Sequence, residues 1–262
     1  MKSFYERIKV FWDKRDLVKL LVEKDLKLKY RRSFLGYVWS VLNPLLVMIV
    51  MTVVFRYMFR FDIENFPVYL FTGQLMFNFM NISTSNAMNS ITSNAALLKK
   101  VYVPKYIFTF SKITSGLVDL VFSLGALVLV MIFTGARFSL FNLLSIIPIF
   151  ELYVFCIGLG MLISALNVFF RDIQYIWNAV STAWMYLTPI FYPITALPAK
   201  LQWIVKHLNP MYFYIGQFRD FVYSNTFPGW GIILEGLCAA LLMCLIGTAV
   251  FWKKQDEFIL YI

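Results

Sequence analysis

Residues 25–54 carry the sequence DLKLKYRRSFLGYVWSVLNPLLVMIVMTVV, which joins a basic segment to a long apolar one. Five cations lie within the nine residues 24–32, and residues 33–55 then form a charge-free run of 23 residues. About 20 apolar residues in a helix are enough to cross the hydrocarbon core of a bilayer. Basic residues beside such a span stay in the cytoplasm. This stretch therefore predicts a membrane span and also predicts which of its ends is cytoplasmic.

The composition of the whole chain supports a membrane protein. Hydrophobic residues make up 60% of the 262 positions and charged residues 15%, with a mean hydropathy of +0.71. Soluble domains contain about 25% charged residues, so the composition argues against a water-soluble fold. Much of the net charge of +10 lies in residues 1–32, which hold 11 Lys or Arg against five acids. A basic segment beside a span favours anionic lipid or a cytoplasmic partner over nucleic acid.

An all-α integral membrane protein with six transmembrane helices is predicted, after a cytoplasmic interface region at residues 1–34. Residues 3–14 place aromatic and charged side chains on opposite sides of a helix, which is typical of an amphipathic interface helix. The transmembrane domain covers residues 35–262, with spans at about 36–59, 66–90, 113–134, 142–167, 173–189 and 229–252. Residues 190–228 are rich in Phe, Tyr and Trp, and we expect short or re-entrant helices there, on the outer side.

The distribution of Lys and Arg predicts the orientation of these spans. The connections assigned to the cytoplasm carry 18 of these residues, and the outer connections carry six. Because positive residues are retained in the cytoplasm, this bias predicts that both termini are cytoplasmic. The six cations assigned to the outer side are Arg56, Arg60, Arg137, Lys200, Lys206 and Arg219.

Polar residues gather in the second half of the second span. Five of them fall within about 80° of one another on a helix with 3.6 residues per turn. They are Asn78, Asn81, Ser85, Asn89 and Thr92. Such a stripe either joins transmembrane helices through hydrogen bonds or lines a hydrated pathway. Both interpretations stay open.

Three acids fall inside predicted spans, each some six or seven residues from a helix end: Asp119, Glu151 and Glu235. A charged group at the bilayer centre costs about 2.5–3.5 kcal/mol on insertion scales, so such groups usually face protein or water. Pairing with a nearby Lys, Arg or Asn is the favoured interpretation. A proton relay, as in a secondary transporter, is the alternative.

The motifs of nucleotide binding and catalysis are absent from the sequence. There is no G-x-x-x-x-G-K-[ST], so the chain has no P-loop of its own. There is also no H-E-x-x-H, no G-x-S-x-G and only one histidine, His207. Cys156, Cys238 and Cys244 lie in apolar runs without paired spacing, and we expect them to be buried hydrophobic residues. We therefore expect no catalytic residue, metal site or bound cofactor, and the charged N-terminus predicts no cleavable signal peptide.

Taken together, short motifs along the chain resemble the permease subunit of type-2 ABC exporters, in the branch that exports O-antigen, capsule or teichoic-acid-type polysaccharides. The resemblance covers essentially the whole chain. The motifs are DLKLKYRRSFLGYVW at 25–39 with Asn43-Pro44, LKKVYVP at 98–104, FRDI at 170–173, TPIFYP at 188–193 and LNP at 208–210.

The resemblance implies a division of labour between subunits. Two copies of the permease pair to form the pathway for a lipid-linked glycan in the cytoplasmic membrane of a bacterium or archaeon. Two separate ATPase subunits bind ATP and Mg and dock on the cytoplasmic side. The implied ATPase contacts are Asp25, Lys27, Lys29, Arg31 and Arg32 in an interface helix, Leu98, Lys99, Lys100, Tyr102, Pro104 and Lys105 in a coupling helix, and Arg171 and Asp172.

The same resemblance implies an outer gate within residues 190–228 and just before them. The candidate gate residues are Pro189, Phe191, Tyr192, Pro193, Asn209 and Pro210. The candidates for lining the pathway are Asn78, Asn81, Ser85 and Asn89. Three other functions stay open: an ABC exporter of drugs or small lipids, an ion- or proton-coupled carrier, and a membrane glycan enzyme. The enzyme is disfavoured because no acid–base or metal constellation is present.

Overall fold

The structure is a computed structural model that describes residues 12, 14–31, 35–58, 63–101 and 103–262. Within these ranges the regular structure is entirely helical. The amphipathic helix predicted for residues 3–14 falls largely outside the described residues, and Arg32 and Tyr102 lie outside them as well. The predicted all-α fold class is confirmed for the part of the chain that is described.

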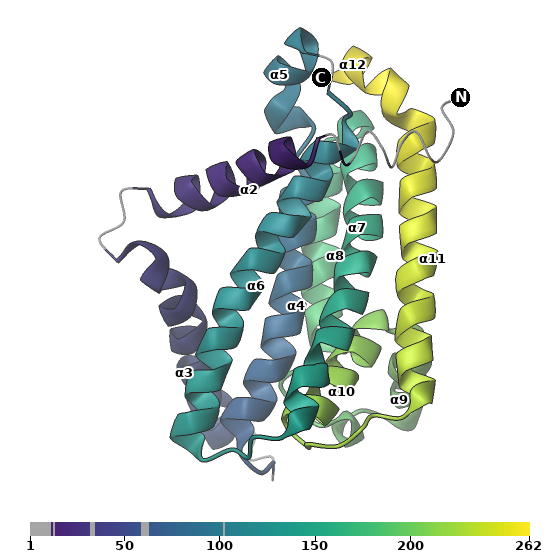
Figure 1. The fold of residues 1–262 in the computed structure, drawn as a ribbon. Helices are drawn as coiled ribbons and strands as arrows, with labels where there is room; N and C mark the ends of the chain where they lie inside the picture. The colour runs from purple at the N-terminus through teal and green to yellow at the C-terminus, as the bar shows by residue number, and fades with distance from the viewer. Residues whose placement is uncertain (1–11, 13, 32–34, 59–62, 102) are drawn as a thin grey trace.

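Long helices run between two ends of the molecule (Figure 1). They are α3 (Trp39–Met58), α4 (Phe66–Met88), α6 (Tyr106–Thr134), α7 (Ile146–Phe169), α8 (Ile173–Leu187) and α11 (Trp230–Lys254). Other helices lie at both ends. At one end are α2 (Arg15–Tyr30), α5 (Ala95–Lys100) and α12 (Phe258–Tyr261), and at the other are α9 (Ala199–Leu208) and α10 (Pro210–Val222). We name these the α5–α12 end and the α9–α10 end.

Several of the long helices have the length and the apolar composition of a membrane span. Among the described residues four segments meet both conditions: Gly36–Phe55, Tyr106–Thr134, Leu140–Phe169 and Trp230–Tyr261. α4 has 23 residues, about 35 Å at 1.5 Å per residue, but it is more polar and most of its side chains are buried. Most of its residues therefore meet protein rather than lipid. α8 has only 15 residues.

The helix that contains Asp119 begins earlier than the sequence predicts. α6 starts at Tyr106 rather than near residue 113, so Lys112 lies inside the helix. Asp119 is therefore more than three turns from the start of α6, and the predicted distance of six or seven residues is wrong. The reason is that Lys112 does not mark a solvated connection, because its ammonium group pairs with Asp25 of α2.

The core forms where α4, α6, α7 and α11 pack together. α7 and α11 share the most extensive contact between any two helices. At their crossing, a Cβ atom on Gly247 would collide with the carbonyl group of Gly158, and one on Gly158 would collide with the backbone of Met243. Small residues at such a crossing let two backbones approach closely. α4 packs against both α6 and α7 and completes the core.

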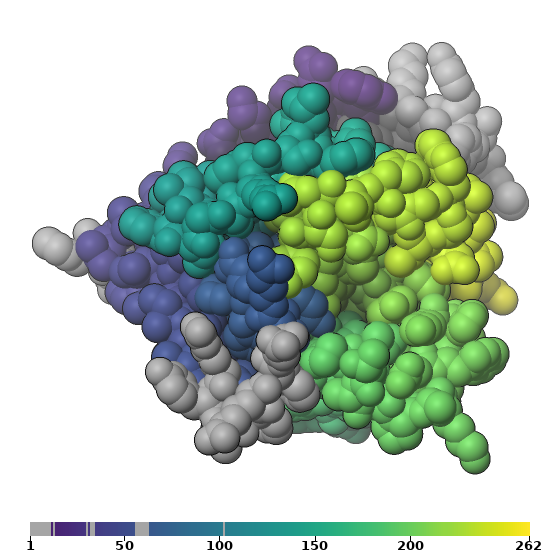
Figure 2. All heavy atoms as spheres, turned by 90° about the horizontal axis from the view of Figure 1, so that it is seen from below, coloured from purple at the N-terminus to yellow at the C-terminus, as the bar shows by residue number. Residues whose placement is uncertain are grey.

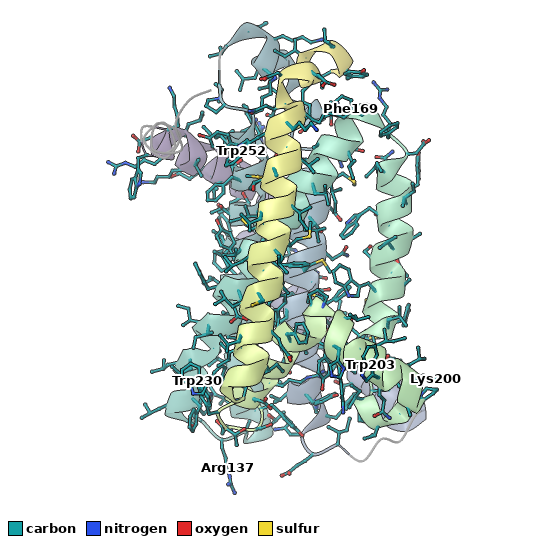
Figure 3. All side chains as sticks on the ribbon, turned by 90° about the vertical axis from the view of Figure 1, so that its right-hand side faces the viewer. Arg137, Phe169, Lys200, Trp203, Trp230 and Trp252 are labelled. Atoms are coloured by element: carbon teal, nitrogen blue, oxygen red, sulfur yellow. The ribbon has the colours of Figure 1, made fainter. Side chains whose placement is uncertain are left out.

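Aromatic side chains mark two levels along the bundle. Trp252 and Phe169 lie near the α5–α12 end, and Trp203 and Trp230 lie near the other end (Figure 3). Trp203 and Trp230 are exposed. Aromatic residues concentrate at the two membrane–water interfaces, so these levels fit a bundle that crosses a bilayer.

The expectation that all three cysteines are buried is wrong for Cys238. Cys156 is buried in the core and Cys244 is half-buried, but Cys238 is exposed on α11. α11 has one face outside the protein core, where lipid would cover it in a bilayer. An apolar run does not distinguish a residue on that face from a residue that faces protein.

Candidate functional site

The short helix α5 presents two lysines at the α5–α12 end. It has six residues and is followed by an extended residue, Val101. Leu98 is buried in a small hydrophobic cluster that also contains Phe108 and Phe258. Lys99 and Lys100 are both exposed. α5 thus has an apolar side that anchors it and a cationic side that is open to a partner (Figure 1).

The C-terminal segment supports the connection that follows α5. Lys105 donates a hydrogen bond from Nζ to the carbonyl oxygen of Gln255, and Nζ lies 5.6 Å from the centre of the Phe258 ring. Burial lowers the pKa of Lys105 from its ordinary value, and the Asp256 carboxylate opposes this effect. Sequence analysis missed this support, because Phe258 follows the last span in a stretch with no motif.

Two ion pairs attach α2 to α6. Lys112 Nζ lies 2.8 Å from Asp25 Oδ1, and Lys29 Nζ lies 2.8 Å from Asp119 Oδ2. Ser115 also donates a hydrogen bond to Asp25 Oδ2, at 3.3 Å. Asp25 and Lys29 are four residues apart on α2, so they share the helix face that meets α6.

The other cations described in the predicted interface helix do not pair with α6. Lys27 and Arg31 are exposed, and Lys27 lies 3.7 Å from Glu23 on the same helix. Of the residues expected to contact an ATPase, α2 therefore offers Lys27 and Arg31 to a partner, while Asp25 and Lys29 bind within the chain. Arg171 and Asp172 are exposed at the turn between α7 and α8, at the same end as α5.

A buried arginine joins α10 to the connection that follows α8. Arg219 is 9% exposed. Its Nη1 donates to the carbonyl oxygen of Pro189 at 2.7 Å, and its Nη2 donates to the carbonyl oxygens of Ile190 at 2.9 Å and Tyr69 at 3.2 Å. The guanidinium carbon lies 3.6 Å from the centre of the Tyr69 ring. Sequence analysis placed Arg219 among the outer cations and gave no sign that it is buried.

The predicted gate residues after α8 form a packed loop on this arginine. Phe191 is buried and its ring stacks on Phe55 with centroids 4.9 Å apart. The Tyr69 hydroxyl donates to the carbonyl oxygen of Tyr192 at 3.1 Å. Pro193 precedes the short 3₁₀-helix η4 (Ile194–Ala196). Seen from the α9–α10 end, the start of α4 lies between the α6–α7 connection and the segment of α9 and α10 (Figure 2).

Asn209 connects the start of α10 to the end of α8. Its Nδ2 donates to Thr188 Oγ1 at 3.0 Å, and its Oδ1 accepts from Trp184 Nε1 at 2.7 Å. The same Oδ1 accepts from the backbone N–H of Met211 at 3.1 Å and caps α10, whose first residue is Pro210. These hydrogen bonds attach Asn209 to Trp184 and Thr188, and a gate role for residues 189–193 and 209–210 stays a prediction.

The residues of the polar stripe on α4 have different surroundings, and some of them join helices while others line a cavity. Asn89 Oδ1 accepts a hydrogen bond from Asn167 Nδ2 at 3.3 Å, which joins α4 to α7. Asn78, by contrast, lines a cavity beside α3 and α6. Asn81 and Ser85 are half-buried between them. A role for these residues in lining a pathway stays a prediction.

The intramembrane acids have three different environments. Asp119 pairs with Lys29, so the predicted pairing with a cation is confirmed there. Glu151 is buried and accepts a hydrogen bond from Gln217 Nε2 at 2.8 Å, so its partner is an amide of α10. Glu235 is exposed on α11. These acids lie on three separate helices, in separate contacts.

A bundle of apolar helices with aromatic residues at two levels defines a multi-pass membrane protein. The family described as ABC-2 type transporter matches residues 16–223. The chain belongs to that family.

Several relatives match nearly the whole chain. The O-antigen export system permease protein RfbA of Myxococcus xanthus is 28% identical over 254 residues, covering 96% of this chain and 97% of that protein. The protein of the same name from Klebsiella pneumoniae is 29% identical over 245 residues, 93% of each chain. The capsule polysaccharide export inner-membrane protein CtrC of Neisseria meningitidis serogroup A is 25% identical, covering 95% of this chain and 93% of that protein.

Proposed function

We propose that this chain is the membrane-spanning permease of an ABC exporter that moves a lipid-linked polysaccharide across the cytoplasmic membrane. The observation that carries the proposal is the similarity, over nearly the full length, to permeases named for O-antigen and capsule export. The chain catalyses no covalent reaction in this proposal. ATP is hydrolysed on a separate P-loop subunit.

The proposed topology has six spans, formed by α3, α4, α6, α7, α8 and α11, with the α5–α12 end in the cytoplasm. Exposed cations at that end support this orientation, because Lys99, Lys100 and Arg171 lie there. Arg137 and Lys200 lie at the opposite end (Figure 3). The α9–α10 segment is then the outer gate, and its connection to α4 runs through Arg219.

Two ATPase subunits are proposed to dock on α5, on the open face of α2 and on the α7–α8 turn. Closure of the ATPase dimer would displace α5, and the α2–α6 ion pairs would transmit the displacement of α2 to the spans. A second copy of this chain is proposed to complete the pathway. The second copy is proposed to pack on the apolar faces that α3 and α8 leave exposed, where Val50 and Tyr175 are 60% and 69% exposed.

The substrate is tested in a strain that lacks this chain. We expect the surface polysaccharide to disappear and the lipid-linked polymer to accumulate inside the cell, with both effects reversed by the intact chain. Normal surface polysaccharide together with increased sensitivity to drugs would favour the alternative, an exporter of drugs or small lipids. Transport that needs no ATPase and fails in Asp119→Asn would favour an ion-coupled carrier.

The docking site is tested by charge reversal on α5. The double variant Lys99→Glu/Lys100→Glu should insert normally and lose export, because the exposed cations would no longer complement the ATPase. Arg137→Glu is the matched control, since Arg137 is exposed at the opposite end in the α6–α7 connection, outside the proposed gate. Surface polysaccharide and co-purification of the ATPase are measured for each. Unchanged export in the α5 variant would remove α5 from the coupling mechanism.

A further inference from the structure

The C-terminal segment of the chain lies between two parts of the molecule that are proposed to meet the ATPase. It consists of the 3₁₀-helix η5 (Gln255–Glu257) and α12 (Phe258–Tyr261), which follow α11 directly. α12 packs against both α5 and α7. α5 is one proposed docking element, and the end of α7 leads into the α7–α8 turn, which is another. The sequence motifs assign no role to this C-terminal segment.

Phe258 joins α12 to α5. Its side chain is fully buried, in the cluster that contains Leu98 of α5. Lys105, which follows α5, donates a hydrogen bond to the carbonyl oxygen of Gln255 and lies over the Phe258 ring. α5 has six residues, and a helix of that length is too short to be stable by itself. Its position in the molecule therefore depends on these contacts.

The same side chain joins α12 to the end of α7. The centroid of the Phe169 ring lies 5.8 Å from that of Phe258 and 4.8 Å from that of Tyr261. Both pairs are T-shaped, which is an arrangement that aromatic rings favour. Phe251 of α11 is a third neighbour, with its ring centroid 5.2 Å from that of Phe258. Phe169 is the last residue of α7, so Phe258 lies between α5 and the start of the α7–α8 turn.

A partner at this end of the molecule would bind α5 and the α7–α8 turn together. Lys99 and Lys100 are exposed on α5, and Arg171 and Asp172 are exposed in the turn, at the same end (Figure 1). Ordering two separate elements when a partner binds subtracts from the free energy of binding. A surface that already has its bound arrangement avoids that cost. The contacts of Phe258 supply such an arrangement.

We propose that Phe258 is a positioning residue that holds α5 and the α7–α8 turn at one fixed spacing, so that the ATPase meets a single preformed surface. The proposal rests on the proposed function and adds the element that orders the docking surface. Without the Phe258 side chain, α5 keeps its exposed lysines but loses the support beneath Leu98. It then takes several positions relative to the turn, and the ATPase binds more weakly.

The spacing is measured by pulsed electron–electron double resonance on the full chain in lipid nanodiscs, without an ATPase. Spin labels are attached to Leu97→Cys on α5 and Arg171→Cys in the turn, and serine replaces the native cysteines that are not buried. We expect one narrow distribution of distances in the parent chain and a broader one in Phe258→Ala. The control is Leu260→Ala, which should not broaden the distribution because its side chain is 82% exposed.

A second pair of labels separates this loss of order from a general failure to fold. The labels are attached to Phe150→Cys of α7 and Leu234→Cys of α11, which are exposed sites toward the α9–α10 end. The distance between them should not change in Phe258→Ala. Unchanged spacing between α5 and the turn, or equal broadening for both pairs of labels, overturns the proposal.

Binding is measured with the ATPase that co-purifies with the intact chain. Phe258→Ala should weaken its binding about tenfold, because two elements must then be ordered when it binds. Phe258→Leu should recover most of the affinity, since it keeps a large apolar side chain. Equal affinity for the intact chain and Phe258→Ala overturns the proposal. If no ATPase co-purifies with the intact chain, the proposed function fails, and the label distances still decide whether Phe258 positions α5.

Discussion

The two ends of the molecule use charge in opposite ways. At the α5–α12 end, α2 is attached to α6 by ion pairs whose side chains are partly exposed, 28% and 19% for Lys112 and Asp25. At the α9–α10 end, Arg219 is buried and binds three backbone carbonyl oxygens. Partly exposed pairs contribute about 1 kcal/mol or less, whereas hydrogen bonds to a buried charge contribute about 1.5–3 kcal/mol each. We therefore expect α2 to separate from the bundle more easily than the loop at Pro189 and Ile190 does.

The largest effect is expected at Arg219. Arg219→Met should lower the free energy of unfolding by about 3 kcal/mol or more, because three buried carbonyl oxygens lose their donor. Unfolding in mixed micelles with increasing denaturing detergent measures the change. The free energy of unfolding of Arg219→Lys should lie between those of the intact chain and Arg219→Met. A lysine keeps the positive charge, but its ammonium group lacks the planar set of donors that a guanidinium group has. Lys206→Met, at an exposed site on the neighbouring α9, is the control, and equal stability of all three variants would contradict the comparison.

A smaller effect is expected at the α2–α6 contact. Asp25→Lys and Lys112→Asp each place like charges together and should cost about 1 kcal/mol and much of the export activity. The double variant Asp25→Lys/Lys112→Asp restores opposite charges and should recover both. A double-mutant cycle on unfolding measures the interaction directly. Single variants that keep full export, or a double variant that recovers nothing, would show that the ion pair does not link α2 to α6.

The smallest effect is expected at the C-terminal pair. Lys254 lies 3.0 Å from Glu257, with both side chains about half exposed, at 44% and 45%. Lys254→Ala should therefore change the free energy of unfolding by about 0.5 kcal/mol or less. The same unfolding assay applies, with Lys253→Ala as the exposed neighbour for comparison. If Lys254→Ala lowered the free energy of unfolding as much as Asp25→Lys does, the contribution of these ion pairs would not depend on how exposed they are.

The fold was largely predictable, because the apolar composition of a short segment is enough to show that it prefers lipid to water. The apolar runs predicted near 36–59, 142–167 and 229–252 correspond to α3, α7 and α11, since about 20 mainly apolar residues are needed for a helix to cross a bilayer. α4 was also predicted, although its second half is polar. The start of α6 was missed, because Lys112 is accommodated by Asp25, which lies 87 residues earlier in the chain.

The candidate site was less predictable than the fold. The motifs pointed to α5 and to residues 188–193, but the residues that hold these two segments are distant in sequence. Arg219 binds the carbonyl oxygens of Pro189 and Tyr69. Every residue has a backbone carbonyl group, so the sequence does not show which ones bind an arginine. Phe258, which packs in the cluster under α5, was missed for a similar reason. A buried aromatic residue after the last span has no local signal that distinguishes it from a solvated tail.

The close crossing of α7 and α11 has a consequence for measuring motion. With backbone against backbone at Gly158 and Gly247, neither helix has room to slide or roll over the other. The pair should keep one fixed spacing throughout a transport cycle. Spectroscopic labels on these two helices would then supply a stationary reference frame, and any change in distance from that frame to α2 or α8 would report displacement of those helices alone.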